Sequence, residues 1–294
     1  MNVVHLVPKT EAPMPERHTT ELRRRLMDVL NTEPIGFGSM AVQIGGGPLA
    51  GLIRSKALHT VYQPIVSLCG GTIYSHEALI RGPQGTLFQA PDALLAAAQD
   101  ENLNFEFEIV CISLALERWG ALGESGRLFV NISAAVLVQV MAHYGREGLT
   151  KLIRSFGVLP RMLVMEITEY ERVADMDQLA TIAHDIRSAG VSLALDDFGD
   201  GRSSLRLWAQ LRPEIVKIDK YFTKNISQHA DKVKTIQSLQ QIAAIFDTAL
   251  VAEGIETEDD LRVLRDLGIA YGQGYFLGRP AQLPLAENGS QALV

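Results

Sequence analysis

Eight short apolar runs, each closed by a polar or charged residue, recur along this chain of 294 residues. Between them lie longer segments with apolar residues at helical intervals, at 91–101, 105–119, 176–189, 230–247 and 257–267. Strands that alternate with helices build a parallel sheet, and eight such units favour closure into a barrel. The pattern therefore predicts an α/β fold, a (β/α)8 TIM-like barrel, in a single domain with an N-terminal extension.

An open, doubly wound sheet is the alternative to a barrel. Sheets of that kind carry a glycine-rich phosphate-binding turn after the first strand. No such turn follows the first run, and Gly36-Phe-Gly38 hints at one but follows no strand. A single barrel of about 250 residues also fits the length of the chain.

Composition divides the chain into three parts. Residues 1–48 form a polar tail, a short helix over 21–31 and a glycine-rich connection, residues 49–282 form the barrel, and 283–294 form a C-terminal tail. No apolar stretch approaches the roughly 20 residues of a membrane span, and the N-terminus lacks the apolar centre of a secretory signal. We therefore expect a cytoplasmic protein with no membrane span in this chain.

Charge and cysteine content restrict the ligand. The net charge of -7 argues against binding of DNA or RNA polymers, which are held by an excess of lysine and arginine. Cys69 and Cys111 are too few for a metal knuckle or a disulfide framework, and we expect both to be buried or partly buried free thiols. An anionic ligand would need metal ions between itself and this chain.

The polar residues that close the runs are the candidate site: Gln63, Glu77, Asn131, Glu166, Asp196, Asp197, Lys217, Asp219, Glu253 and Gln273. In a barrel, the C-terminal ends of the strands converge on one mouth, so these side chains should meet there. Crowded carboxylates demand a compensating cation, and ligands that are all oxygens select Mg²⁺ or Mn²⁺. The adjacent Asp196 and Asp197 suggest two ions and the hydrolysis of a phosphodiester. The plainer alternative is that these carboxylates only cap helices or pair with arginine.

Seven short motifs in this order resemble those of the EAL-domain cyclic di-GMP phosphodiesterase family, over about residues 50 to 282. They are EALIR at 77–81, NIS at 131–133, EIT at 166–168, DDFG at 196–199, KID at 217–219, EGIE at 253–256 and QGYF at 273–276. The resemblance implies a barrel that hydrolyses cyclic di-GMP to linear pGpG with two Mg²⁺ or Mn²⁺ ions. It also implies a homodimer, and the chain is compatible with a longer parent protein that carries a sensor or cyclase domain.

The resemblance further implies a role for each matching position. The metal ligands are Glu77, Asn131, Glu166 and Asp196 for one ion, and Asp196 and Asp197 for the second. The catalytic residues are Lys217, which contacts the water and the phosphate, Glu253, as general base or water-positioning group, and Gln273, beside a metal-bound water. The substrate-binding residues are Gln63, Arg81 and Pro280, and Arg81 suits a phosphate because its planar fork donates two hydrogen bonds. Glu256 matches a structural carboxylate that steadies the loop after the fifth strand.

The loop after DDFG departs from the family. The family usually has threonine or alanine, then glycine, then an aromatic residue, whereas this chain has Asp200-Gly201-Arg202. Since the loop links dimer contacts to the metal site in the family, the change affects basal activity and regulation. Our hypothesis is that Asp200 and Arg202 pair locally or across a dimer.

Other functions compete with hydrolysis. A binding module that senses cyclic di-GMP without cleaving it is the main alternative, although such modules usually lack some metal ligands and this sequence has them all. The dipeptide His184-Asp185 is found in a second class of phosphodiesterases, but no other histidine stands at a ligand spacing. A sugar-processing barrel would require an aromatic-rich cleft that the sequence lacks.

Overall fold

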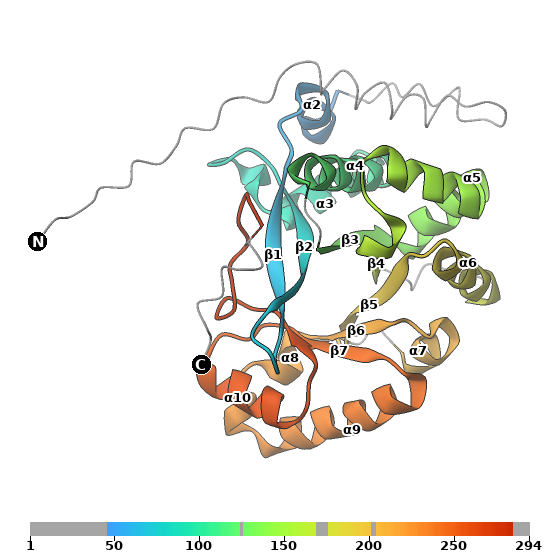
Figure 1. Ribbon diagram of the computed structural model, residues 1–294. Coiled ribbons are helices and arrows are strands. Elements are labelled where there is room, and N and C mark those ends of the chain that lie inside the picture. Colours follow the sequence, from blue (N-terminus) through green and yellow to red (C-terminus); the bar gives the residue numbers. More distant parts are fainter. Residues whose placement is uncertain (1–45, 124–125, 169–175, 201–203, 285–294) are drawn as a thin grey trace, which may run out of the picture. The chain divides into compact units, whose positions relative to one another are not determined.

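The computed structural model describes residues 46–284, apart from 124–125, 169–175 and 201–203. Its eight strands close into one barrel in chain order, with helices packed around the outside (Figure 1). The strands are β1 (His59–Ser67), β2 (Ile73–Arg81), β3 (Arg127–Ser133), β4 (Leu163–Thr168), β5 (Ser192–Phe198), β6 (Ile215–Ile218), β7 (Ala249–Ala252) and β8 (Tyr271–Gly272). The expected α/β barrel is confirmed.

Helices follow most strands, as the periodicity predicted. The α-helices are α2 (Pro48–Ser55), α3 (Pro91–Asp100), α4 (Asn104–Leu122), α5 (Ala134–Ser155), α6 (Met176–Ser188), α7 (Leu205–Leu211), α8 (Lys220–Thr223), α9 (Ala230–Phe246) and α10 (Glu258–Asp266). Short 3-10 turns occupy η1 (Leu87–Gln89), η2 (Pro160–Met162) and η4 (Ile226–Gln228). Within this described part of the chain, none of the helices combines the length and apolarity needed to cross a bilayer.

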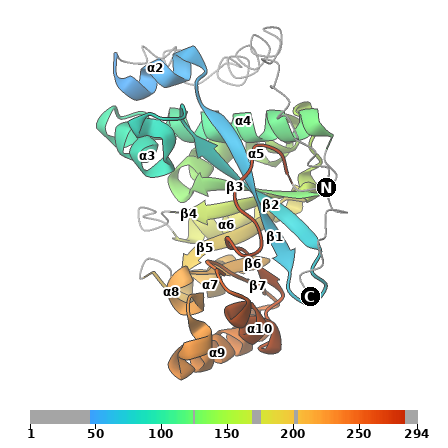
Figure 2. The ribbon, with the colours of Figure 1, turned by 90° about the vertical axis from the view of Figure 1, so that its left-hand side faces the viewer.

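The direction of the first strand differs from the expectation. β1 runs antiparallel to both of its neighbours, β2 and β8, while the other pairs of strands are parallel (Figure 2). A tight turn at Gly70-Gly71 joins β1 to β2, and Gly71 has a positive φ of 66° that suits glycine. Gln63 and Glu77 therefore face each other in the middle of a hairpin, so neither residue lies at a strand end as the sequence suggested.

The predicted boundary between the glycine-rich connection and the barrel domain falls at the start of a helix. Pro48–Ser55 forms α2, which precedes the first strand. Proline at the first turn of a helix is well tolerated, and the carboxylate of Glu101 accepts hydrogen bonds from the amides of Leu49 (2.7 Å) and Ala50 (3.0 Å). The predicted helix at 21–31 lies outside the described residues.

An apolar layer fills the barrel. It consists of one buried residue from each of six strands, Ile65, Phe129, Val164, Ala194, Ile215 and Val251, with Tyr74 and Tyr271 packed against them. The rings of Tyr74 and Tyr271 stack with centroids 3.8 Å apart. Trp119 and Trp208 are buried outside this layer. The cysteines are free: Cys111 is partly buried as expected, but Cys69 is exposed.

Candidate functional site

A polar layer lies directly above the apolar one. Successive side chains in a strand point to opposite faces, so the residue two positions further along points into the barrel again. Counting two positions on from the core residues gives Asn131, Glu166, Asp196, Lys217, Glu253 and, after Tyr271, Gln273. In the reversed β1 the count runs backwards, from Ile65 to Gln63. The predicted convergence of polar residues thus follows from strand geometry.

Lys217 lies at the centre of the polar layer. Its ammonium nitrogen Nζ is 2.7 Å from Glu253, 3.2 Å from Glu77 and 3.3 Å from Asp196, and it also contacts Glu166. The side chain is 2% exposed. A single ammonium group therefore faces four carboxylates, which leaves an excess of negative charge at the mouth.

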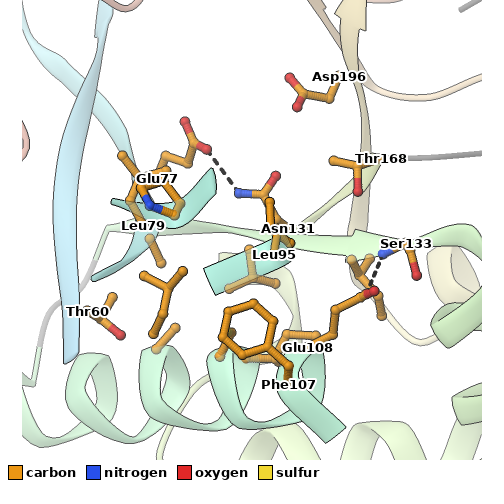
Figure 3. A pocket seen from close by; sticks show the side chains of 18 of the residues that line it. Thr60, Glu77, Leu79, Leu95, Phe107, Glu108, Asn131, Ser133, Thr168 and Asp196 are labelled. Atoms are coloured by element: carbon orange, nitrogen blue, oxygen red, sulfur yellow. Dashed lines mark hydrogen bonds between the residues drawn. The ribbon is translucent and has the colours of Figure 1, made fainter. Parts of the chain in front are cut away.

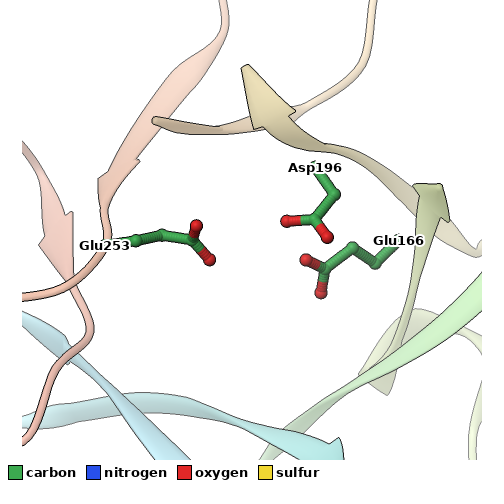
Figure 4. Close-up of side chains that lie close together, drawn as sticks. All are labelled: Glu166, Asp196 and Glu253. Atoms are coloured by element: carbon green, nitrogen blue, oxygen red, sulfur yellow. The ribbon is translucent and has the colours of Figure 1, made fainter. Parts of the chain in front are cut away.

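Two groups of carboxylates gather around this point. Glu166, Asp196 and Glu253, here called the first acidic group, have oxygen atoms within 4.8 Å of one another, and their side chains point toward one another (Figure 4). Asp197, Asp219 and Glu253, the second acidic group, satisfy the same distance. Glu253 belongs to both groups.

An irregularity in β5 lets two adjacent aspartates line the same cavity, which has a volume of about 380 Å³ and is also lined by Glu77 and Asn131. Neighbouring residues of a regular strand point to opposite faces. The pairing of β5 with β6 shifts register between Leu195 and Phe198, and Asp197 has a left-handed φ of 47°. Asp196 and Asp197 both line the cavity as a result. Such backbone strain at an irregular strand end is typical of functional sites.

The pKa values reflect burial and the excess of carboxylates. Burial, with Asp196 adding to it, raises the pKa of Glu166 well above its ordinary value. Burial also raises the pKa of Glu253 to about 8 and that of Asp197 to about 6. For Asp196 burial has the largest effect and would raise the pKa, but the charge of Lys217 and hydrogen bonds to the carboxylate together lower the value. The single cation therefore lowers the pKa of Asp196, while Glu166, Glu253 and Asp197 hold their protons more tightly than usual.

Glu77 connects these groups to β3 and β8. Its Oε1 accepts a hydrogen bond from Asn131 Nδ2 at 3.0 Å, and its Oε2 accepts one from Gln273 Nε2 at 2.7 Å. The carbonyl oxygen of Asn131 is directed away from Glu77, on the side of Asp196 (Figure 3). The amide of Asn131 is therefore oriented so that its oxygen is available to a ligand.

The donor set fits divalent cations. All the candidate ligands are oxygens, the chemistry that Mg²⁺ and Mn²⁺ prefer. Two buried oxygens, Glu166 Oε2 and Gln273 Oε1, have no hydrogen-bond partner in the described part of the chain. Buried oxygens of this kind normally have partners, so a cation or its bound water would satisfy them.

The predicted substrate-binding residues fall in two places. Arg81 and Pro280 line a cavity of about 410 Å³ together with Tyr275 and Arg279. The guanidinium of Arg279 lies 4.2 Å from the centre of the Tyr275 ring, within cation–π distance. Gln63 lies instead beside Glu77, and its Nε2 donates to the carbonyl of Gly278 at 3.2 Å.

Of the three remaining predicted positions, the two that the structure describes, Glu256 and Asp200, lie outside the acidic groups. Glu256 forms an exposed ion pair of 2.9 Å with Lys224, at the end of α8. Asp200 lines the cavity that also contains Asp197, but Arg202 lies outside the described residues, so their pairing stays a prediction.

The structure groups two residues in a way that the sequence did not predict. Asp219 is a strand ending for which the sequence predicts no role; it completes the second acidic group and also caps α8 by accepting from the amide of Tyr221 at 2.8 Å. Glu253, expected to act as general base or water-positioning group, belongs to both acidic groups, and its catalytic role stays a prediction. The signal in the sequence was that the KID and EGIE motifs each close a buried apolar run, which places Asp219 and Glu253 at the same end of the barrel.

Fold and site together define an eight-stranded barrel protein with a carboxylate-rich mouth. The EAL domain model matches residues 49–280. The chain belongs to the EAL domain family, which confirms the resemblance seen in its motifs.

Curated relatives carry related names. The chain is 33% identical over 236 residues to the probable cyclic di-GMP phosphodiesterase PdeB of Escherichia coli, covering 77% of this chain and 43% of that protein. It is 31% identical over 245 residues to the cyclic di-GMP phosphodiesterase NbdA of Pseudomonas aeruginosa, covering 80% and 30%. The chain thus spans less than half the length of these relatives.

A solved structure has the same fold. The manganese and cyclic di-GMP complex of Klebsiella pneumoniae BlrP1 superposes with a TM-score of 0.65 at 28% identity. The match covers 76% of this chain and 56% of that chain.

Proposed function

We propose that this protein is a metal-dependent phosphodiesterase that hydrolyses cyclic di-GMP to linear pGpG. The observation that carries the proposal is the pair of acidic groups sharing Glu253 around the buried Lys217. Membership of the EAL family and the names of its relatives support the choice of substrate.

In this proposal the two acidic groups hold two divalent cations, Mg²⁺ or Mn²⁺. Glu166, Asp196 and Glu253 serve one ion, and Asp197, Asp219 and Glu253 serve the other. Glu77 and Asn131 complete the donor set from the hairpin and β3. When bound, such ions stabilise charge on the phosphoryl group and lower the pKa of a coordinated water.

The remaining residues bind and orient the dinucleotide. Arg81 donates to a phosphate through its planar guanidinium, while Tyr275 and Pro280 offer apolar faces to a base. Lys217 places its positive charge where negative charge develops as the phosphodiester opens. Glu253 positions the attacking water, because its carboxylate lies within reach of both groups.

The test is turnover by the purified protein. We expect cyclic di-GMP to be converted to pGpG, measured by liquid chromatography, in Mg²⁺ or Mn²⁺ and not in EDTA. Glu166→Gln keeps the size of the side chain and should lower the rate at least 100-fold, in the range seen when a preorganised charge is removed. Absence of pGpG at any enzyme concentration would falsify the proposal. Tight binding of cyclic di-GMP without turnover would favour the sensor module.

A further inference from the structure

Glu108, on α4, lies beside the candidate site without belonging to either acidic group. Its carboxylate lines the cavity of about 380 Å³ that also contains Glu77 and Asn131. Its Oε2 accepts a hydrogen bond of 2.7 Å from the amide of Ser133, the last residue of β3 (Figure 3). The side chain thus links α4 to the end of the strand that carries Asn131.

The end of β3 lacks support on one side. β3 pairs with β2 only as far as Val130, opposite Ala78, whereas Asn131 to Ser133 pair on the β4 side alone. The cavity occupies the β2 side at this level, so packed side chains do not fill it. A buried backbone amide needs an acceptor, and Glu108 provides one where the sheet does not.

The junction between β3 and α5 makes a carboxylate favourable here. Ser133 is the N-cap of α5, and its Oγ accepts from the amide of Val136 at 3.3 Å. The first amides of a helix have no partners within the helix and attract negative charge. Glu108 therefore fixes both the strand end and the helix start.

We propose that Glu108 is a positioning residue that holds Asn131 in place for cation binding. Asn131 lies two residues before Ser133, and its amide is held on the other side by Glu77. Fixing Ser133 keeps the Asn131 oxygen aimed into the site. The inference rests on the proposed function, since it treats Asn131 as a metal ligand. Residues that orient metal ligands typically contribute 10- to 100-fold to affinity.

The experiment compares variants of two capping carboxylates. Glu108→Ala removes the acceptor, Glu108→Gln retains a side-chain oxygen, and Glu101→Ala is the matched control. Glu101 also lies in the α3–α4 layer and caps a helix, but it serves the amides of Leu49 and Ala50 in α2. Mn²⁺ affinity is measured by electron paramagnetic resonance of the free ion, and protection of the Ser133 amide by hydrogen exchange without metal.

We expect Glu108→Ala to weaken Mn²⁺ binding at least 10-fold and to speed exchange at Ser133, with Glu108→Gln restoring most of both. Glu101→Ala should lower the melting temperature and leave Mn²⁺ affinity within about twofold, because its helix does not carry a candidate ligand. Equal Mn²⁺ affinity in Glu108→Ala and wild type would overturn the inference, as would equal weakening by Glu101→Ala. Mn²⁺ binding without turnover of cyclic di-GMP would overturn the proposed function alone, and no Mn²⁺ binding by wild type would overturn both.

Discussion

Replacing Lys217 with methionine removes a cation that contacts four carboxylates. Methionine is close to lysine in length and apolar, so it fills the space without a charge. In wild type the ammonium lies within 3.3 Å of Glu77, Asp196 and Glu253 and also contacts Glu166. The variant leaves these buried carboxylates uncompensated unless metal ions or protons take the place of the ammonium.

The size of the effect follows from burial. Breaking a buried ion pair by removing one partner costs about 3–5 kcal/mol. For a domain of this size each kcal/mol lowers the melting temperature by roughly 2–4 °C, so a loss of about 6–20 °C is expected without metal. Lys224→Met is the matched control, because it breaks an exposed ion pair of 2.9 Å with Glu256. Exposed pairs of this kind contribute about 1 kcal/mol or less.

The assay is thermal unfolding in EDTA and in Mn²⁺. We expect Lys217→Met to unfold well below wild type in EDTA, with a deficit that grows from pH 6 to pH 8 as the carboxylates lose protons. Mn²⁺ should raise the melting temperature of the variant more than that of wild type, since the ions replace the lost charge. A Lys217→Met protein as stable in EDTA as the Lys224→Met control would refute this account.

Three further changes test other parts of the fold and the site. His76 is buried and its pKa is lowered to about 4 by that burial, below the ordinary value of 6.5. As pH falls, the unfolded chain therefore takes up the proton before the folded chain does. Between pH 7.5 and pH 5 the free energy of unfolding of wild type, measured in urea, should fall by about 2 kcal/mol relative to that of His76→Phe. A difference between the two proteins that does not change with pH would contradict this prediction. Gly274→Ala would place a Cβ 2.2 Å from the carbonyl oxygen of Ile255 and should cost about 1–3 kcal/mol, whereas Gly51→Ala meets nothing within 4 Å and should be neutral or stabilising. Asp219→Asn retains a helix cap but loses a charge, so the melting temperature should stay close to that of wild type. Mn²⁺ titration should show one ion bound at least 10-fold more weakly. Unchanged Mn²⁺ affinity at both sites would show that Asp219 is not a ligand.

Much of the barrel could be predicted because strand and helix periods differ. The segments at 91–101, 176–189 and 230–247 match α3, α6 and α9 closely. The direction of β1 could not be read from its apolar pattern, since a strand looks the same in either direction. The signal was the turn at Gly70-Gly71, too short for the crossover that a parallel pair requires.

The acidic groups were predictable in membership but not in arrangement. Each strand ending marked a residue at the mouth, yet the sharing of Glu253 depends on the break in β5 that turns Asp197 toward it. If β5 were regular up to its end, the side chains of Asp196 and Asp197 would point to opposite faces of the sheet. Glu108 could not be found, because the contact that ties it to β3 is with the backbone amide of Ser133, which no side-chain motif signals.

The reversed first strand changes where the chain enters the barrel. In a barrel whose strands are all parallel, the first strand starts at the end opposite to the active site. Here His59 starts β1 opposite Arg81, at the end of the barrel that carries the candidate site, and α2 directly precedes it. The same helix is tied through Glu101 to the layer that holds Glu108. A force applied to the chain before Pro48 would therefore act first on the end of the barrel that carries the candidate site, and not on the opposite end.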